Sequence, residues 1–190
     1  LYTRDADHYT LTSTATPLGL VAFFRPGKIL IHSTGTVTAQ GLQPQEFSYQ
    51  YEADSRKSSD AKFLWGTRQL KLNHDGIHAN LDLPSGTQDR LSAMYQFIFL
   101  HPHDAQNLEF PMTNGSKLDH YRYAVTTGSP CNSSAGQFDT WYLDSEAKKG
   151  ETRTQIWLAI TRNNLPCKII ITDPDGGKLT QELRSLETQP

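Results

Sequence analysis

The feature that most constrains the fold is a series of short stretches in which apolar and polar residues alternate, each followed by a turn sequence. Lys28–Ala39 and Phe47–Tyr51 show this period of two, which is typical of β-strands that bury one face. His74-Asp75-Gly76 lies between two such stretches and fits a type I′ hairpin turn, because Asp-Gly tolerates positive φ angles. The strands follow one another at short spacing, so the sequence predicts an antiparallel meander rather than a βαβ fold.

One segment, Asp89–Leu100, departs from this pattern and has the spacing of a helix. Its main apolar residues follow the i, i+3, i+4, i+7, i+8 positions of one helix face. These residues are Leu91, Met94, Tyr95, Ile98 and Phe99. Asp89 is a suitable N-cap and complements the helix dipole. Phe97 adds apolar surface outside this face, so we expect a helix that is buried on most sides.

The length and composition indicate one small-cored domain. A chain of 190 residues suits a single domain, and we expect residues 1–190 to form it. Hydrophobic residues make up 36% of the chain and the mean hydropathy is −0.56, which predicts a thin core and sheets with one solvent-exposed face. Residues 17–24 form a short apolar stretch that fits either a single helical turn or a buried strand.

Charge and hydropathy argue against two classes of partner. The 18 Lys and Arg residues nearly balance the 20 Asp and Glu residues, and no basic stripe is present, so we expect no nucleic-acid binding. No apolar run approaches the ~20 residues of a membrane-spanning helix, so we expect no transmembrane segment in this chain. The chain begins at Leu1 rather than Met, which suits a processed or trimmed N-terminus.

The sequence contains none of the short motifs of nucleotide binding, serine hydrolases or metalloproteases, so we expect neither enzyme activity nor a cofactor. Ser145-Glu-Ala-Lys148 fits an S-x-x-K pattern, but it lies in a polar loop without a companion motif. His101, His103 and Asp104 carry donor atoms for a metal. They fit a solvated loop at the helix end better, and we expect no metal.

Two cysteines, Cys131 and Cys167, occur without a CxxC motif or the Cys/His spacing of a metal site. In an oxidising compartment they can pair as a disulfide. The alternative is two unpaired thiols, one in a loop and one in a strand. The sequence leaves both alternatives open, because it does not give the distance between the two residues.

Large aromatic side chains are numerous for so thin a core. They are Trp65, Tyr95, Phe97, Phe99, Trp141 and Trp157. The simplest interpretation is that these rings fill the core. The alternative is that they line a groove for an acyl chain or another apolar ligand, because curved sheets and barrels can enclose a hydrophobic cavity.

Several short segments occur in an order that is typical of one protein family. The most specific is Gln88-Asp-Arg-Leu-Ser92, the larger part of Gly86-Thr-Gln-Asp-Arg-Leu-Ser92, which leads into Tyr95-Gln96. The others are Gly41-Leu-Gln-Pro44 with Phe47, Phe63-Leu-Trp65, Gln155-Ile-Trp157-Leu158, Leu165-Pro166, Asp175-Gly-Gly177 and Gln181-Glu-Leu183. With these segments the chain resembles the bacterial family called domain of unknown function 3108 (DUF3108). The resemblance runs from about Tyr9 to Leu186.

The resemblance implies an exported, periplasmic protein of Gram-negative bacteria, in a family of which some members are tethered by an N-terminal membrane segment. It also implies a strongly curved antiparallel sheet or half-barrel with helical insertions, similar to the carriers that localise lipoproteins. The insertions would be the buried helix at about 89–100 and a short helix near 17–24. No activity is established for the family. Cys167 stands where the family suggests an aliphatic residue, so the family gives no support for a disulfide.

Together, the residues and the resemblance predict a non-enzymatic periplasmic protein that binds a lipid-like, apolar or amphipathic ligand in the concavity of a curved sheet. Arg90 is expected either to pair with a nearby carboxylate or to meet an anionic head group at the mouth of the cavity. The candidate ligand-binding residues are Trp65, Arg90, Leu91, Met94, Tyr95, Ile98, Phe99 and Trp157. The alternative function is a structural or protein-interaction module of envelope assembly that uses an exposed sheet edge or face.

Overall fold

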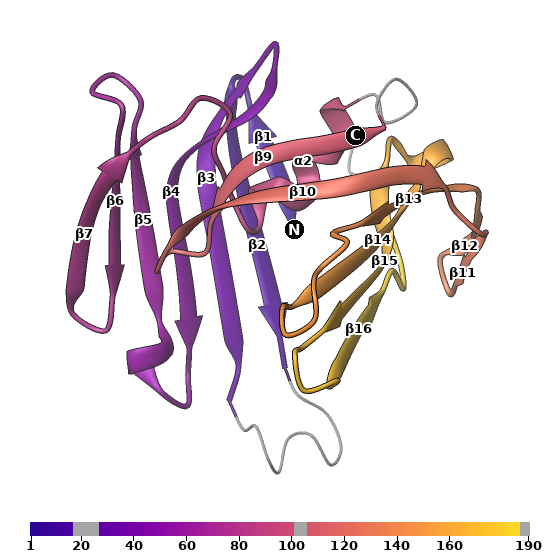
Figure 1. Cartoon of the computed structure of the whole chain (residues 1–190). Helices are drawn as coiled ribbons and strands as arrows, with labels where there is room; N and C mark the ends of the chain where they lie inside the picture. Colours follow the sequence, from indigo (N-terminus) through magenta and orange to yellow (C-terminus); the bar gives the residue numbers. More distant parts are fainter. Residues whose placement is uncertain (17–26, 101–105, 187–190) are drawn as a thin grey trace. The chain divides into compact units, whose positions relative to one another are not determined.

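A computed structural model of the chain describes residues 1–16, 27–100 and 106–186 (Figure 1). Within these residues the strands form two seven-stranded sheets and one two-stranded hairpin. The chain is organised in two compact units, Leu1–Ala93 with Phe110–His120, and Met94–Glu109 with Tyr121–Pro190. Each unit draws on two separate stretches of chain, and the prediction that residues 1–190 form a single domain stays a prediction.

The first sheet lies in the first unit, and its strands follow the order of the sequence with antiparallel pairing throughout (Figure 1, indigo to purple). They are β1 (Tyr2–Asp5), β2 (His8–Ala15), β3 (Ile29–Thr38), β4 (Gly41–Tyr51), β5 (Ser59–Leu64), β6 (Gln69–His74) and β7 (Ile77–Asp82). A 3₁₀ helix, η1 (Ser55–Lys57), joins β4 to β5. The predicted meander is confirmed, as is the turn at Asp75 and Gly76, whose φ angles of 50° and 73° are both positive.

One face of the first sheet carries the core of the first unit. A row of cross-strand neighbours runs over five strands of this face, and every member is buried. The row consists of Leu11, Ser33, Phe47, Ala61 and Leu72. The opposite face is polar, with Ser48, Asp60 and Asn73 as direct neighbours on β4, β5 and β6. This division between an apolar and a polar face follows from the alternation of residues along each strand.

The second sheet has the strand order β16-β15-β14-β13-β10-β9-β8. The strands are β8 (Gln88–Asp89), β9 (Asn107–Thr113), β10 (Leu118–Thr127), β13 (Thr140–Asp144), β14 (Arg153–Ala159), β15 (Leu165–Thr172) and β16 (Lys178–Glu182). β8 and β9 pair in parallel, whereas the pairs from β10 to β16 are antiparallel. The hairpin consists of β11 (Cys131–Ser133) and β12 (Gly136–Phe138), and a 3₁₀ helix, η4 (Ile160–Arg162), precedes β15. The predicted mainly β fold with a curled antiparallel sheet is confirmed.

The helix predicted at 89–100 is confirmed in a shorter form. It consists of α2 (Ser92–Gln96), continued by the 3₁₀ helix η2 (Phe97–Phe99). Gln88 and Asp89 of the specific motif instead form β8, because they pair with Met112 and Thr113 of β9. Ser92, Ala93 and Phe97 are buried, and the other residues of α2 and η2 are partly buried. The short helix predicted near 17–24 lies outside the described residues. Within the described ranges, no helix is long and apolar enough to span a membrane.

Candidate functional site: a buried carboxylate beneath an exposed arginine

A buried carboxylate, Asp89, is the centre of a hydrogen-bond network in the first unit. Ser33 Oγ donates to Asp89 Oδ2 at 2.6 Å, and Tyr9 Oη lies 3.2 Å from Ser33 Oγ. Asp89 Oδ1 accepts hydrogen bonds from the backbone N–H groups of Leu91 and Ser92, both at 2.8 Å. The exposed fraction of Asp89 is 0%. The network therefore joins β8 and the start of the helical segment to β2 and β3 of the first sheet.

The contacts of Asp89 with the chain that follows it have the geometry of a helix cap. Its carboxylate accepts from the second and third residues after it, as an N-cap side chain does. In return, Ser92 Oγ accepts a hydrogen bond from the backbone N–H of Asp89 at 3.0 Å. This reciprocal pair is the arrangement of a capping box. The N-cap role that the sequence predicts for Asp89 is confirmed.

Burial changes the acid–base properties of this network. Burial raises the pKa of the Asp89 carboxyl above its usual value, although hydrogen bonds from Ser33, Ser92 and Leu91 act in the opposite direction. Burial and the nearby Asp89 charge also raise the pKa of the Tyr9 hydroxyl. Among the described residues, no cation forms an ion pair with Asp89. A carboxyl group that is fully enclosed is out of reach of a substrate, so its role is to position the motif.

Arg90, the next residue, is exposed and its backbone is fixed. The Arg90 N–H donates to the carbonyl oxygen of Thr113 at 3.0 Å. Its guanidinium carbon lies 5.7 Å from the centroid of the Tyr49 ring, a cation–π contact. No carboxylate of the described residues pairs with the Arg90 guanidinium. The ion pair expected for Arg90 is therefore absent among the described residues, and the contact with an anionic head group stays a prediction.

Tyr49 connects Arg90 to the apolar face of the first sheet. On β4 it lies opposite Ile31 of β3, and both side chains pack against the buried core cluster of this unit. Trp65 packs against the same cluster. The Trp65 indole donates to the carbonyl oxygen of Pro44 at 2.6 Å, and its ring stacks on Phe63 with a centroid distance of 6.1 Å. A cation and a partly exposed apolar surface thus meet at Tyr49.

The family model described as "Protein of unknown function (DUF3108)" matches residues 2–184, almost the entire chain. The chain belongs to this family. The predicted membership is confirmed, and the matched range includes the Asp89 network and Arg90. No curated protein and no solved structure is significantly similar to the chain. The predicted similarity of this DUF3108 fold to lipoprotein-localisation carriers therefore stays a prediction.

The eight predicted ligand-binding residues divide between the two units. Trp65, Arg90 and Leu91 belong to the first unit. Arg90 is exposed, Trp65 is partly buried and Leu91 is buried with 9% exposed. The second unit contains Met94, Tyr95, Ile98, Phe99 and Trp157, all partly buried. Burial raises the pKa of the Tyr95 hydroxyl. Within the first unit, Arg90 contacts the Tyr49 ring, and Trp65 packs against the core cluster that also supports Tyr49.

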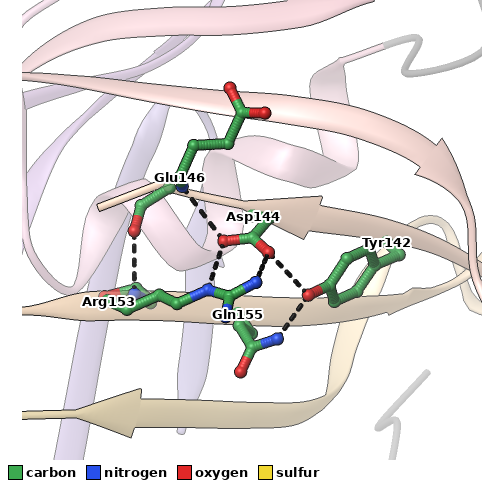
Figure 2. A network of polar contacts seen from close by, with 7 residues as sticks. Tyr142, Asp144, Glu146, Arg153 and Gln155 are labelled. Atoms are coloured by element: carbon green, nitrogen blue, oxygen red, sulfur yellow. Dashed lines mark hydrogen bonds and ion pairs between the residues drawn. The ribbon is translucent and has the colours of Figure 1, made fainter. Parts of the chain in front are cut away.

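Trp157 belongs to a polar and aromatic cluster of the second unit. Its ring lies 4.9 Å from that of Tyr142, and Lys168 Nζ lies 5.8 Å from its centroid. Beside it, Arg153 forms two hydrogen bonds to Asp144, one of them from Nε to Oδ1 at 2.9 Å (Figure 2). Tyr142 Oη donates to Asp144 Oδ2 at 2.8 Å. These contacts engage the Asp144 carboxylate fully, which indicates a structural cluster.

We expect Arg153→Gln to lower the free energy of unfolding at pH 7 by about 1 kcal/mol, a modest value because the Arg153 side chain is 48% exposed and screened by solvent. Arg153 holds the pKa of Asp144 at about 2, below its usual value of 3.8. The stability that this pair contributes is therefore present above pH 3.8 and is lost as the pH falls towards 2. Urea unfolding at a series of pH values measures the loss. The control is Arg122→Gln, because the Arg122–Glu109 pair is 62% and 60% exposed and should contribute nothing measurable.

A polar hollow of about 380 Å³ in the first unit is lined by residues of the face opposite the core and also by Tyr49. Ser48, Asp60 and Asn73 line it, as does Arg56. The Arg56 guanidinium is already held by two hydrogen bonds to Asp54, at 3.0 and 3.1 Å. This hollow does not suit an apolar ligand.

The described part of the chain holds no cluster of three metal-ligating side chains. His101, His103 and Asp104, which carry donor atoms for a metal, lie outside the described residues.

Proposed function

We propose that this protein is a non-enzymatic, exported envelope protein that binds an amphipathic, anionic ligand such as a lipid through its first unit. The Arg90 guanidinium would meet the head group, and the apolar part would lie on the Tyr49 and Ile31 side of the first sheet. The observation that carries the proposal is the exposed Arg90, which stacks on Tyr49 and has no carboxylate partner in the described ranges.

The buried network beneath Arg90 supports this role. An arginine on a mobile loop would lose side-chain and backbone freedom on binding. Here the residues on both sides of Arg90 are held, because Asp89 is fully buried and Leu91 is 9% exposed. The cation is thus presented at a fixed position beside an aromatic ring. Guanidinium groups are suited to carboxylates and phosphates, because their N–H groups can bind two oxygens at once.

We expect Arg90→Gln to weaken the binding of dodecanoate about tenfold, because a hydrogen bond to a charged group contributes roughly 1.5 kcal/mol. Binding of dodecyl maltoside, which has the same chain and a neutral head, should change little. Isothermal titration calorimetry below the micelle concentration measures both affinities. The matched control is Arg56→Gln, which removes an arginine of the same unit from the polar hollow.

Three outcomes would contradict the proposal. Equal weakening by both substitutions would indicate a general charge effect, and weakening by Arg56→Gln alone would place the ligand in the polar hollow. Binding of neither ligand would remove the ligand hypothesis. The alternative, a protein-interaction module, would then be favoured, and the edge strand β16, whose residues Lys178–Glu182 are all exposed, supports it.

A further inference from the structure

The two cysteines of the chain lie together in the second unit, although they are far apart in sequence. Cys131 begins β11 of the small hairpin, and Cys167 lies on β15. Both belong to one buried apolar cluster, with exposed fractions of 4% and 0%. Phe138 and Ala159 complete the buried part of this cluster. The cluster therefore packs the β11–β12 hairpin against β15.

The two thiols are close enough to influence each other. Burial raises the pKa of the Cys167 thiol to about 12, and the neighbouring Cys131 thiol is the next largest cause. The Cys167 thiol also donates to the carbonyl oxygen of Trp157 at 3.3 Å. A buried thiol with so high a pKa is a poor nucleophile, because the thiolate is the reactive form. Oxidation of this pair therefore needs a disulfide donor and an opening of the hairpin.

We propose that Cys131 and Cys167 are a dithiol pair that forms an intramolecular disulfide and thereby fastens the β11–β12 hairpin to β15. The oxidant is a disulfide, either of a small molecule or of an oxidoreductase. One cysteine attacks this disulfide as the thiolate and forms a mixed disulfide, and one thiol leaves. The second cysteine then attacks the mixed disulfide, the Cys131–Cys167 bond forms and a second thiol leaves. Two electrons and two protons pass to the oxidant. The inference does not depend on a ligand.

The full chain provides the test, with oxidised glutathione as the probe. After incubation and denaturation with an excess of N-ethylmaleimide, the oxidised protein should take up no label, and the reduced protein should take up two. A non-reducing peptide map should contain one linked pair of peptides, with Cys131 and Cys167. The oxidised protein should also melt at a temperature higher by roughly 5–10 °C, because a disulfide restricts the unfolded chain.

Two cysteine variants make the outcome specific. Cys131→Ser should abolish the increase in melting temperature and leave a single thiol that reacts with label or carries glutathione. Cys167→Ser should behave in the same way, and Cys131→Ala is the alternative if serine is not tolerated in the buried cluster. Two labels, or two glutathione adducts, on oxidised wild-type protein would overturn the proposal, as would an increase in melting temperature that persists in Cys131→Ser.

Discussion

Replacement of Asp89 by alanine is expected to lower the free energy of unfolding by about 3 kcal/mol or more. The substitution removes the acceptor of three hydrogen bonds, from the Ser33 hydroxyl and from the N–H groups of Leu91 and Ser92. Buried donors without acceptors each cost about 1–3 kcal/mol, and the lost helix cap adds to this cost. Because Asp89 is fully buried, water cannot replace the missing contacts without a rearrangement. Urea unfolding followed by far-ultraviolet circular dichroism measures the change.

Asparagine at the same position is the informative control. Asp89→Asn keeps one side-chain oxygen for the N–H groups of Leu91 and Ser92. Its amide nitrogen would face Ser33 Oγ, which can accept this hydrogen bond if its own hydrogen turns towards Tyr9 Oη. The free energy of unfolding at pH 7 should therefore stay within about 1 kcal/mol of the wild-type value. A loss as large as that of alanine would show that the charge of Asp89, rather than its hydrogen bonds, stabilises the motif.

The pH dependence of stability separates these two explanations further. Burial raises the pKa of Asp89 in the folded state above its unfolded value of about 3.8. The folded state therefore binds a proton more tightly than the unfolded state. The contribution of Asp89 to stability is largest below pH 3.8 and decreases as the pH rises through the pKa of the folded state. Relative to Asp89→Asn, the wild-type protein should gain stability on acidification, and a constant difference would contradict the raised pKa.

The alternation of residues was sufficient to predict the strands but not their distant partners. The period of two in Lys28–Ala39 and Phe47–Tyr51 corresponds to β3 and β4, and Asp75-Gly76 predicted the turn between β6 and β7. These signals are local. The contact of Ser33 with Asp89 joins residues 56 positions apart, and nothing near either residue indicates it. This contact depends on the tertiary arrangement of the strands, which the residues next to Ser33 and Asp89 do not indicate.

The boundaries of the helix show how tertiary pairing overrides a local pattern. Asp89 was predicted to cap a helix that begins at once, and its side chain does cap the following N–H groups. Its backbone nevertheless pairs with Thr113 of β9, so that α2 begins at Ser92. Asp89 therefore takes part in a strand through its backbone and caps the start of the helix through its side chain. The sequence contains the cap, whereas the strand partner could not be predicted from the residues near Asp89.

The candidate site was predicted in part for a similar reason. Arg90 was selected from its motif, and the structure adds Tyr49, on which the guanidinium stacks. Tyr49 belongs to an alternating strand and carries no local sign of this contact. Trp65 and Trp157 were grouped by ring size, yet they lie in different units. The size of an aromatic ring predicts that it is buried. The strand order determines which of the rings contact one another.

Gly35→Ala is expected to destabilise the protein by about 3 kcal/mol or more, because the new methyl group has no space. A Cβ atom at Gly35 would lie 2.2 Å from the carbonyl oxygen of Gln43 and 2.8 Å from Cα of Pro44. Both are backbone atoms, which cannot turn aside as a flexible side chain can. The position lies at a shift in the register of β3 and β4, between Thr34 and Gly35, where the two backbones approach closely.

The same substitution should also disturb the Asp89 network, which distinguishes it from a simple loss of packing. The new Cβ would lie 2.9 Å from Cε1 of Tyr9, the ring whose hydroxyl contacts Ser33. Displacement of this ring would weaken the support of Asp89 from the first sheet. The control is Gly66→Ala, because a Cβ at Gly66 meets no atom within 4 Å, and it should leave the free energy of unfolding within about 0.5 kcal/mol. If Gly35→Ala were as stable as this control, the close approach of β3, β4 and Tyr9 would be wrong, and with it the account of how the sheet holds the carboxylate beneath Arg90.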